Sequence, residues 1–125
     1  MSGAVLAYVA AAMLIAWGAA HLAPTRVVAA SFGDISLDSR RILVMEWMAE
    51  GFTHVFLGVL VILITALQGA DEPATQLVYR VTAGVLVLVA GLTASTGART
   101  SVVWFRICPF VLSGAAVLLL GASFA

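Results

Sequence analysis

The sequence predicts an all-α protein, a membrane-spanning antiparallel four-helix bundle that forms a single transmembrane domain over residues 1–125. The first observation behind this prediction is composition, because 63% of the residues are hydrophobic and only 10% are charged. Soluble domains carry about 25% charged residues, and disordered chains carry more charge still. The second observation is a set of four apolar stretches, each close to the length of about 20 residues that crosses a bilayer. Together they exclude a soluble globule and a disordered chain.

The four predicted helices use most of the chain and leave no room for a second domain. They cover residues 4–22, 42–67, 78–98 and 102–124. The first carries no charge before His21, and no basic residue precedes it, so we expect a retained helix rather than a cleaved signal peptide. Ser36-Leu37-Asp38-Ser39, ahead of the second apolar stretch, is typical of a helix N-terminus. Pro109 is expected to kink the last helix.

The arginines predict the orientation of the bundle. Four passes place both termini on one side and put the long segment 23–41 and the turn 97–101 on the other. Four arginines belong to the second side, and Arg106 lies just inside it, whereas only Arg80 belongs to the side of the termini. The four are Arg26, Arg40, Arg41 and Arg99. Because cytoplasmic loops carry an excess of basic residues, the loop 23–41 is predicted to be cytoplasmic and both termini outside.

Small residues recur at heptad spacing in each predicted helix. The pairs are Ala11/Gly18, Gly51/Gly58, Gly84/Gly91 and Gly114/Gly121. In lipid, helices associate through close backbone contact over small side chains, and a seven-residue repeat keeps such contacts on one stripe. The pattern predicts a tightly packed left-handed bundle.

Charge and cysteine content exclude several functions. Six basic residues balance six acidic ones, so nothing indicates a nucleic-acid partner. The single cysteine, Cys108, excludes a membrane dithiol oxidoreductase and a cysteine-rich metal site.

Ionisable side chains gather at the predicted cytoplasmic end. Glu46, Glu50 and His54 are spaced four residues apart and share one helix face. His21 ends the first helix where the second begins, which can bring it level with Glu46 or Glu50. An ionisable group at the bilayer centre costs about 2.5–3.5 kcal/mol, so such groups face the bundle interior and have partners. A carboxylic acid, a carboxylate and an imidazole form a proton-transfer unit, and these four residues are the catalytic candidates.

Aromatic and basic residues near this end are candidates for ligand binding. They are Trp17, Trp47, Phe52, Trp104, Arg99 and Arg106. The resulting hypothesis is acid–base chemistry on a lipophilic small molecule such as an isoprenoid, a quinone or a sterol-like compound. Isomerisation, cyclisation or epoxide opening would fit, because none of them needs a cofactor.

Two other interpretations fit the same residues. In the first, Glu46 and Glu50 lie at the membrane surface and pair with arginines, so that the cluster pins the helices of a non-catalytic accessory subunit or a homo-oligomer. The tryptophans would then be interfacial anchors. In the second, His21 and His54 hold haem, or bind a metal together with Glu50.

Short motifs in the first half of the chain resemble a known group of proteins. Gly18-Ala19-Ala20-His21-Leu22-Ala23-Pro24, followed by Glu50-Gly51, looks like the small bacterial four-helix membrane proteins called DoxX-like. The resemblance implies a four-helix fold in a bacterial inner membrane and no particular chemistry. Small multidrug resistance transporters have a similar size, but their essential glutamate lies in the first helix, which here contains no acid.

Overall fold

The computed structural model describes residues 2–125, and over this range the chain forms five α-helices, one short 3-10 helix and no strand. The elements are α1 (Gly3–Leu22), α2 (Thr25–Ser31), α3 (Leu37–Gln68), α4 (Pro73–Ser95), η1 (Gly97–Arg99) and α5 (Val103–Ala122). Four of them, α1, α3, α4 and α5, are long and apolar enough to cross a membrane. The predicted all-α, membrane-spanning bundle is confirmed, and the chain is a multi-pass membrane protein.

The helix ends differ from the apolar stretches that predicted them. Segment 23–41, expected to be a connection, contains α2 and the first turn of α3. Ser36 caps α3, because its Oγ accepts a hydrogen bond from the Ser39 backbone N–H at 3.1 Å. Pro73 occupies the first turn of α4, where its missing N–H costs nothing. Hydropathy marks what lies in lipid, whereas capping decides where a helix begins. Pro109 lies inside α5, which remains one continuous helix.

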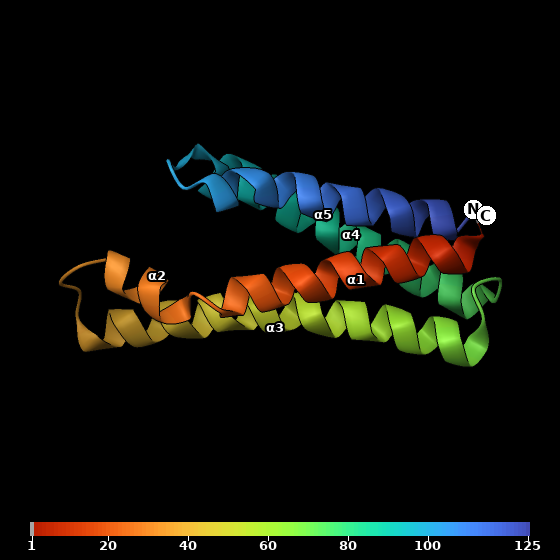
Figure 1. Cartoon of the computed structure of the whole chain (residues 1–125), viewed down its shortest axis with the longest axis horizontal. Helices are drawn as coiled ribbons and strands as arrows, with labels where there is room; N and C mark the ends of the chain where they lie inside the picture. Colours follow the sequence, from red (N-terminus) through yellow and green to blue (C-terminus); the bar gives the residue numbers. More distant parts are fainter. Residues whose placement is uncertain (1) are drawn as a thin grey trace.

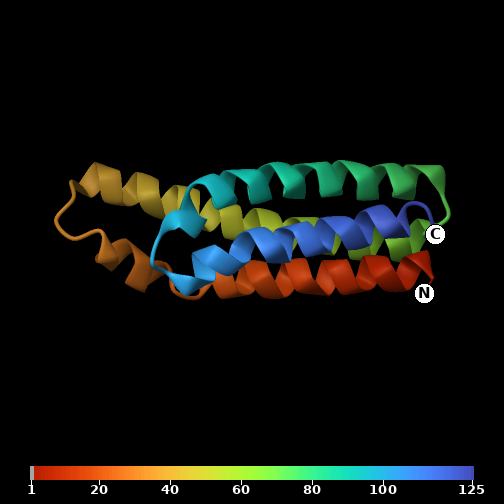
Figure 2. The same ribbon diagram turned by 90° about the horizontal axis from the view of Figure 1, so that it is seen from above.

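The helices pack unevenly around the bundle. α1 packs along both α3 and α5, and α4 packs along α5, whereas α3 and α4 meet over a short length only. Figure 1 shows the α1/α3 pair diverging from the α4/α5 pair toward the end that carries α2, and Figure 2 shows the same helices from above. Both termini lie at the opposite end, as predicted (Figure 1). One half of the bundle is therefore tightly closed and the other half is open.

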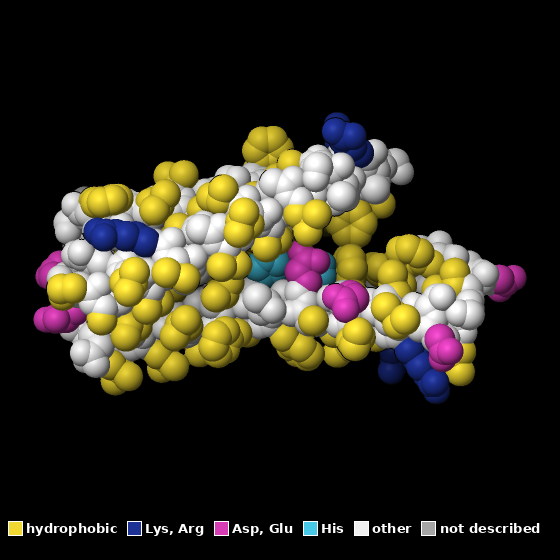
Figure 3. Space-filling model, turned by 180° about the vertical axis from the view of Figure 1, so that it is seen from behind, with side chains coloured by type: hydrophobic (Ala, Val, Ile, Leu, Met, Phe, Trp, Pro, Cys, Tyr) yellow, Lys and Arg dark blue, Asp and Glu magenta, His cyan; other side chains and the backbone are white. Residues whose placement is uncertain are grey.

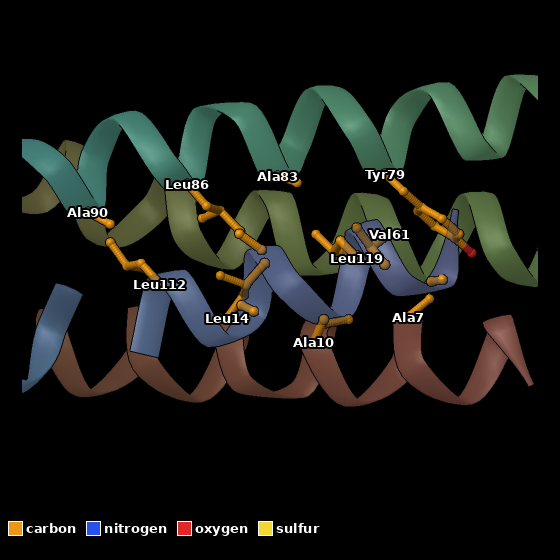
Figure 4. Close-up of a cluster of buried hydrophobic side chains, with 14 of the residues drawn as sticks. Ala7, Ala10, Leu14, Val61, Tyr79, Ala83, Leu86, Ala90, Leu112 and Leu119 are labelled. Atoms are coloured by element: carbon orange, nitrogen blue, oxygen red, sulfur yellow. The ribbon is translucent and has the colours of Figure 1, made fainter. Parts of the chain in front are cut away.

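Small side chains build the closed half. Its buried core is rich in alanine, and Figure 4 shows alanines of α1 and α4 between a few larger residues such as Leu14, Leu86 and Leu119. Tyr79 is fully buried there, and its hydroxyl lies 2.6 Å from Oγ1 of Thr65 on α3. This hydrogen bond links α3 to α4 near the turn that joins them, where the two helices do meet.

Glycines bring α1 and α3 into backbone contact. A Cβ on Gly58 would lie 2.6 Å from Cγ1 of Ile15 and 2.8 Å from the Ala11 carbonyl oxygen, and one on Gly18 would lie 2.7 Å from the Gly51 carbonyl oxygen. Nothing lies within 4 Å of a Cβ built on Gly84 or Gly91 of α4. The heptad prediction is confirmed for α1 and α3 and is wrong for α4, whose glycines face outward.

α3 is much longer than the membrane requires. Its 32 residues extend about 48 Å, whereas the 20 residues of α1 match a hydrocarbon core of about 30 Å. The first turns of α3 therefore project beyond the end of α1, and α2 continues outward from α1 beside them (Figure 1). Arg40 holds α2 in place by donating to the carbonyl oxygens of Ala29 at 3.3 Å and Gly33 at 3.0 Å.

The opposite end is closed by Arg80 of α4. Its guanidinium donates to Oγ of Ser123 at 3.3 Å and to the Ser123 carbonyl oxygen at 3.1 Å, and it lies 4.8 Å from the centre of the Phe124 ring. Ala122 in turn lies against the first turn of α1, since a Cβ on Gly3 would lie 2.9 Å from its carbonyl oxygen.

Candidate functional site

The open half of the bundle contains a cavity of about 1080 Å³. α3 and α4 form its sides, α1 and α5 contribute Trp17 and Cys108, and α2 closes one wall with Val27, Val28 and Phe32. Figure 3 shows this hollow opening between two diverging arms, with histidine and acidic side chains at its inner end. A cavity of this size accommodates a drug-sized or lipid-like molecule.

His21 lies in the wall of the cavity, at the last turn of α1. Its Nε2 is 3.1 Å from the Trp47 carbonyl oxygen and 3.7 Å from a carboxylate oxygen of Glu50. A carbonyl oxygen can only accept a hydrogen bond, so this contact requires the proton on Nε2. Within residues 2–125, Nδ1 of His21 has no hydrogen-bond partner in the protein. This atom is not fully buried. The prediction that His21 lies level with Glu50 is confirmed.

Trp47 fixes the orientation of the His21 ring. The two rings are stacked with centroids 3.9 Å apart, and the indole Nε1 donates to the His21 carbonyl oxygen at 2.9 Å. Phe105 of α5 packs edge-on against Trp47 at 5.6 Å. Because the last carbonyls of a helix have no partner within it, the indole satisfies a free acceptor of α1 and ties α1 to α3 at the same time.

The two glutamates differ in environment. Glu50 is partly buried and faces His21, whereas Glu46, one turn nearer the start of α3, is exposed; both line the cavity. Within the described chain the only ion pairs are His21 with Glu50 and Arg41 with Asp38. The alternative in which arginines pair with Glu46 and Glu50 therefore has no ion pair to support it over residues 2–125.

His54 lies behind the cavity wall rather than in it. It is 2% exposed, and its Nδ1 has no hydrogen-bond partner. Its ring meets the His21 ring edge-on, with centroids 6.4 Å apart. His54 therefore does not line the cavity and packs against His21, which does.

The ligand-binding candidates divide into two groups. All three tryptophans of the chain line the cavity. Phe52, Arg99 and Arg106 do not line it and are exposed. Phe52 is two residues from Glu50, so it points to the opposite side of α3, and each arginine lies at an exposed position, in η1 or in the first turn of α5. The prediction that Phe52, Arg99 and Arg106 line the ligand pocket is therefore wrong.

Several residues that line the cavity were not among the candidate site residues. Thr53, Thr93 and Thr96 add hydroxyl groups on the α3 and α4 sides, and Cys108 adds a thiol. Thr53 could have been found from its spacing of three residues from Glu50. The wall formed by α2 could not, because a helix of seven residues is too short to be predicted from apolar periodicity.

The charged residues of the cavity wall are few. Glu46 and Glu50 line it together with His21, and no arginine of the chain does. Over residues 2–125 no three His, Cys, Asp or Glu side chains come together in an arrangement that could hold a metal ion. The site thus offers a carboxylate and an imidazole 3.7 Å apart in mainly apolar surroundings.

Comparisons with known proteins add no constraint. No family model, curated protein or solved structure matches the chain. The resemblance to DoxX-like proteins stays a prediction, and function has to be argued from the site itself.

Proposed function

We propose that this membrane protein binds a lipophilic small molecule in the cavity and performs acid–base chemistry on it through His21 and Glu50. The observation that supports the proposal most directly is the 3.7 Å approach of the two side chains at the wall of a large cavity whose other lining is mainly apolar. An imidazole and a carboxylate in contact can remove a proton from one atom of a substrate and return a proton to another. Such a transfer suffices for isomerisation, cyclisation or epoxide opening without a cofactor.

Depth in the membrane favours this use of the pair. α1 ends at Leu22 and is just long enough to cross the hydrocarbon core, so His21 and Glu50 belong at its boundary. Glu46 lies one turn, about 6 Å, further out. A lipophilic substrate there keeps its tail in hydrocarbon and presents its polar group to the pair. Trp47 is a positioning residue, because it acts on the substrate through His21.

A second candidate function is structural. The reciprocal hydrogen bonds between His21 and Trp47 connect α1 to α3, as expected of a polar cluster that locks helices in an accessory subunit. The size of the cavity beside this connection favours the first function, because a purely structural cluster needs no adjoining space.

Glu50→Gln distinguishes the two functions. In lipid nanodiscs, farnesol (a linear isoprenoid alcohol) is expected to shift the fluorescence of the three tryptophans. We expect Glu50→Gln to weaken this binding about tenfold, the loss of one charge-assisted hydrogen bond, while thermal stability stays within about 1 kcal/mol. Glu72→Gln, in the turn between α3 and α4, is the matched control and should bind as the unchanged protein does. If Glu50→Gln binds normally but unfolds earlier, the structural function is correct.

We also propose a bacterial inner-membrane location with the α2 end in the cytoplasm. Its support is the resemblance described above and the four arginines at that end. In a Cys108→Ala background, a membrane-impermeant maleimide should label Glu72→Cys in intact spheroplasts and Asp34→Cys only after permeabilisation. The reverse labelling pattern would invert the orientation.

A further inference from the structure

A second, smaller cavity lies between α3 and α4, closer to the turn that joins them. Its volume is about 270 Å³, and its lining is almost entirely aliphatic: Leu57, Leu60, Leu77, Val78, Val81, Thr82 and Val85. Leu77 and Val81 are more than half exposed, so this cavity is open on its lipid side.

Helix register places both cavities along one seam. On α3, Glu50 and Thr53 of the large cavity and Leu57 and Leu60 of the small one follow each other at intervals of three or four residues. On α4, Val85 of the small cavity is four residues from Val89 of the large one. Residues spaced in this way share one helix face. Since α3 and α4 meet over a short length only, their facing stripes leave a trough open to the bilayer.

The polar groups of this trough are concentrated at one end. His21, Glu50 and Thr53 lie there, whereas the lining of the small cavity exposes no polar surface. A ligand that matches this distribution has one polar head and one hydrocarbon tail. From Glu50 to Leu60 the trough runs for about 15 Å at 1.5 Å per residue, which fits a tail of roughly a dozen carbon atoms.

The charges at the polar end restrict the head of the ligand. The charged side chains lining the large cavity are Glu46 and Glu50, with His21 beside them, and no arginine lines it. Two carboxylates repel a phosphate, and no arginine in the lining offsets them. A phospholipid head is therefore disfavoured, whereas a hydroxyl can donate to the Glu50 carboxylate.

We propose that the ligand of this site is a single-chain amphiphile with an uncharged hydroxyl-type head, and that its tail lies in the α3/α4 trough, which it reaches sideways from the bilayer. This inference rests on the proposed function and specifies the class of molecule that the same site takes. It also assigns Val81 and Val85 a role in holding the tail.

The experiment uses 1-dodecanol that carries a photoreactive diazirine near the end of its tail. In nanodiscs we expect irradiation to place adducts on Leu57, Leu60, Val81 and Val85, located by peptide mass spectrometry. Val81→Phe fills the trough and should reduce these adducts about fivefold. Leu88→Phe is the matched control on α4: Leu88 is 76% exposed and lines neither cavity, so its adduct pattern should not change. Unlabelled dodecanol should compete, and dodecyl phosphate should compete at least tenfold less well.

Four outcomes would overturn the inference, and the first three leave the proposed function in place. If dodecanol shifts tryptophan fluorescence but its adducts spread over the lipid-facing belt in all variants, the head site stands and the tail trough is wrong. Equal competition by dodecyl phosphate would contradict the uncharged head. Native mass spectrometry could instead detect a dimer of the unchanged protein that is absent in Val81→Phe. That result would mean that a second copy of the chain fills the trough. Absence of both the fluorescence shift and the trough adducts would remove the proposed function as well.

Discussion

Gly58→Ala and Gly18→Ala should each destabilise the bundle by about 2 kcal/mol. A methyl group on Gly58 would lie 2.8 Å from the Ala11 carbonyl oxygen, and one on Gly18 would lie 2.7 Å from the Gly51 carbonyl oxygen. A backbone oxygen cannot move aside as a flexible side chain can, so α1 and α3 must separate along their length and lose packing. The measurement is unfolding in mixed micelles of increasing denaturing detergent, followed by the helical circular dichroism signal.

Gly84→Ala is the control for these variants, and its effect should have the opposite sign. Gly84 lies in the middle of α4, and nothing within 4 Å would meet the added methyl group. Replacing such a glycine by alanine stabilises a helix by about 0.5–1 kcal/mol. A loss of stability in Gly84→Ala equal to that in Gly58→Ala would show that the close contact between α1 and α3 is not the cause.

Trp47→Ala should cost about 3 kcal/mol and should also weaken ligand binding. The substitution removes the stack on His21, the edge contact with Phe105 and the hydrogen bond to the last turn of α1. Trp47→Phe keeps most of the packing and loses only the hydrogen bond, for which we expect about 1 kcal/mol. Detergent-induced unfolding and farnesol titration of the same samples measure the two effects. The titration follows the remaining tryptophans.

Trp104→Ala serves as the control for loss of an indole from the same cavity. Trp104 is 65% exposed, and within residues 2–125 its ring makes no aromatic pair with another side chain. We expect its removal to change stability by less than about 1 kcal/mol. Equal losses in Trp47→Ala and Trp104→Ala would contradict a specific role for the connection between Trp47 and His21.

The fold could be predicted because lipid imposes few solutions. Four apolar stretches in a chain of this length have to become helices, since a helix satisfies its own backbone hydrogen bonds. The heptad glycines predicted the contact between α1 and α3 because both sides of that interface, Gly18 and Gly51, supply a small residue. The same pattern was misleading in α4, because spacing alone does not tell whether a glycine stripe faces a neighbouring helix or lipid.

The site could be predicted only in part. Position at the end of the first helix was enough to bring His21 beside Glu50, since both follow from helix length and direction. The sequence could not show that α3 and α4 separate, because hydropathy and spacing do not reveal which helices pack along each other. For the same reason the sequence could not show that His54 is buried behind His21.

Closure of the bundle by Arg80 has a consequence for how the chain can be rearranged. With Ser123 held by the guanidinium and Ala122 resting on Gly3, the first and last helices end next to each other. A short linker between these ends would leave every interhelical contact in place. New ends could be opened at Gly33, which is exposed, has a positive φ of 67° and has no neighbour within 4 Å of an added Cβ. Such a circular permutant would start on the opposite face of the membrane, so connectivity and orientation could be varied separately from packing.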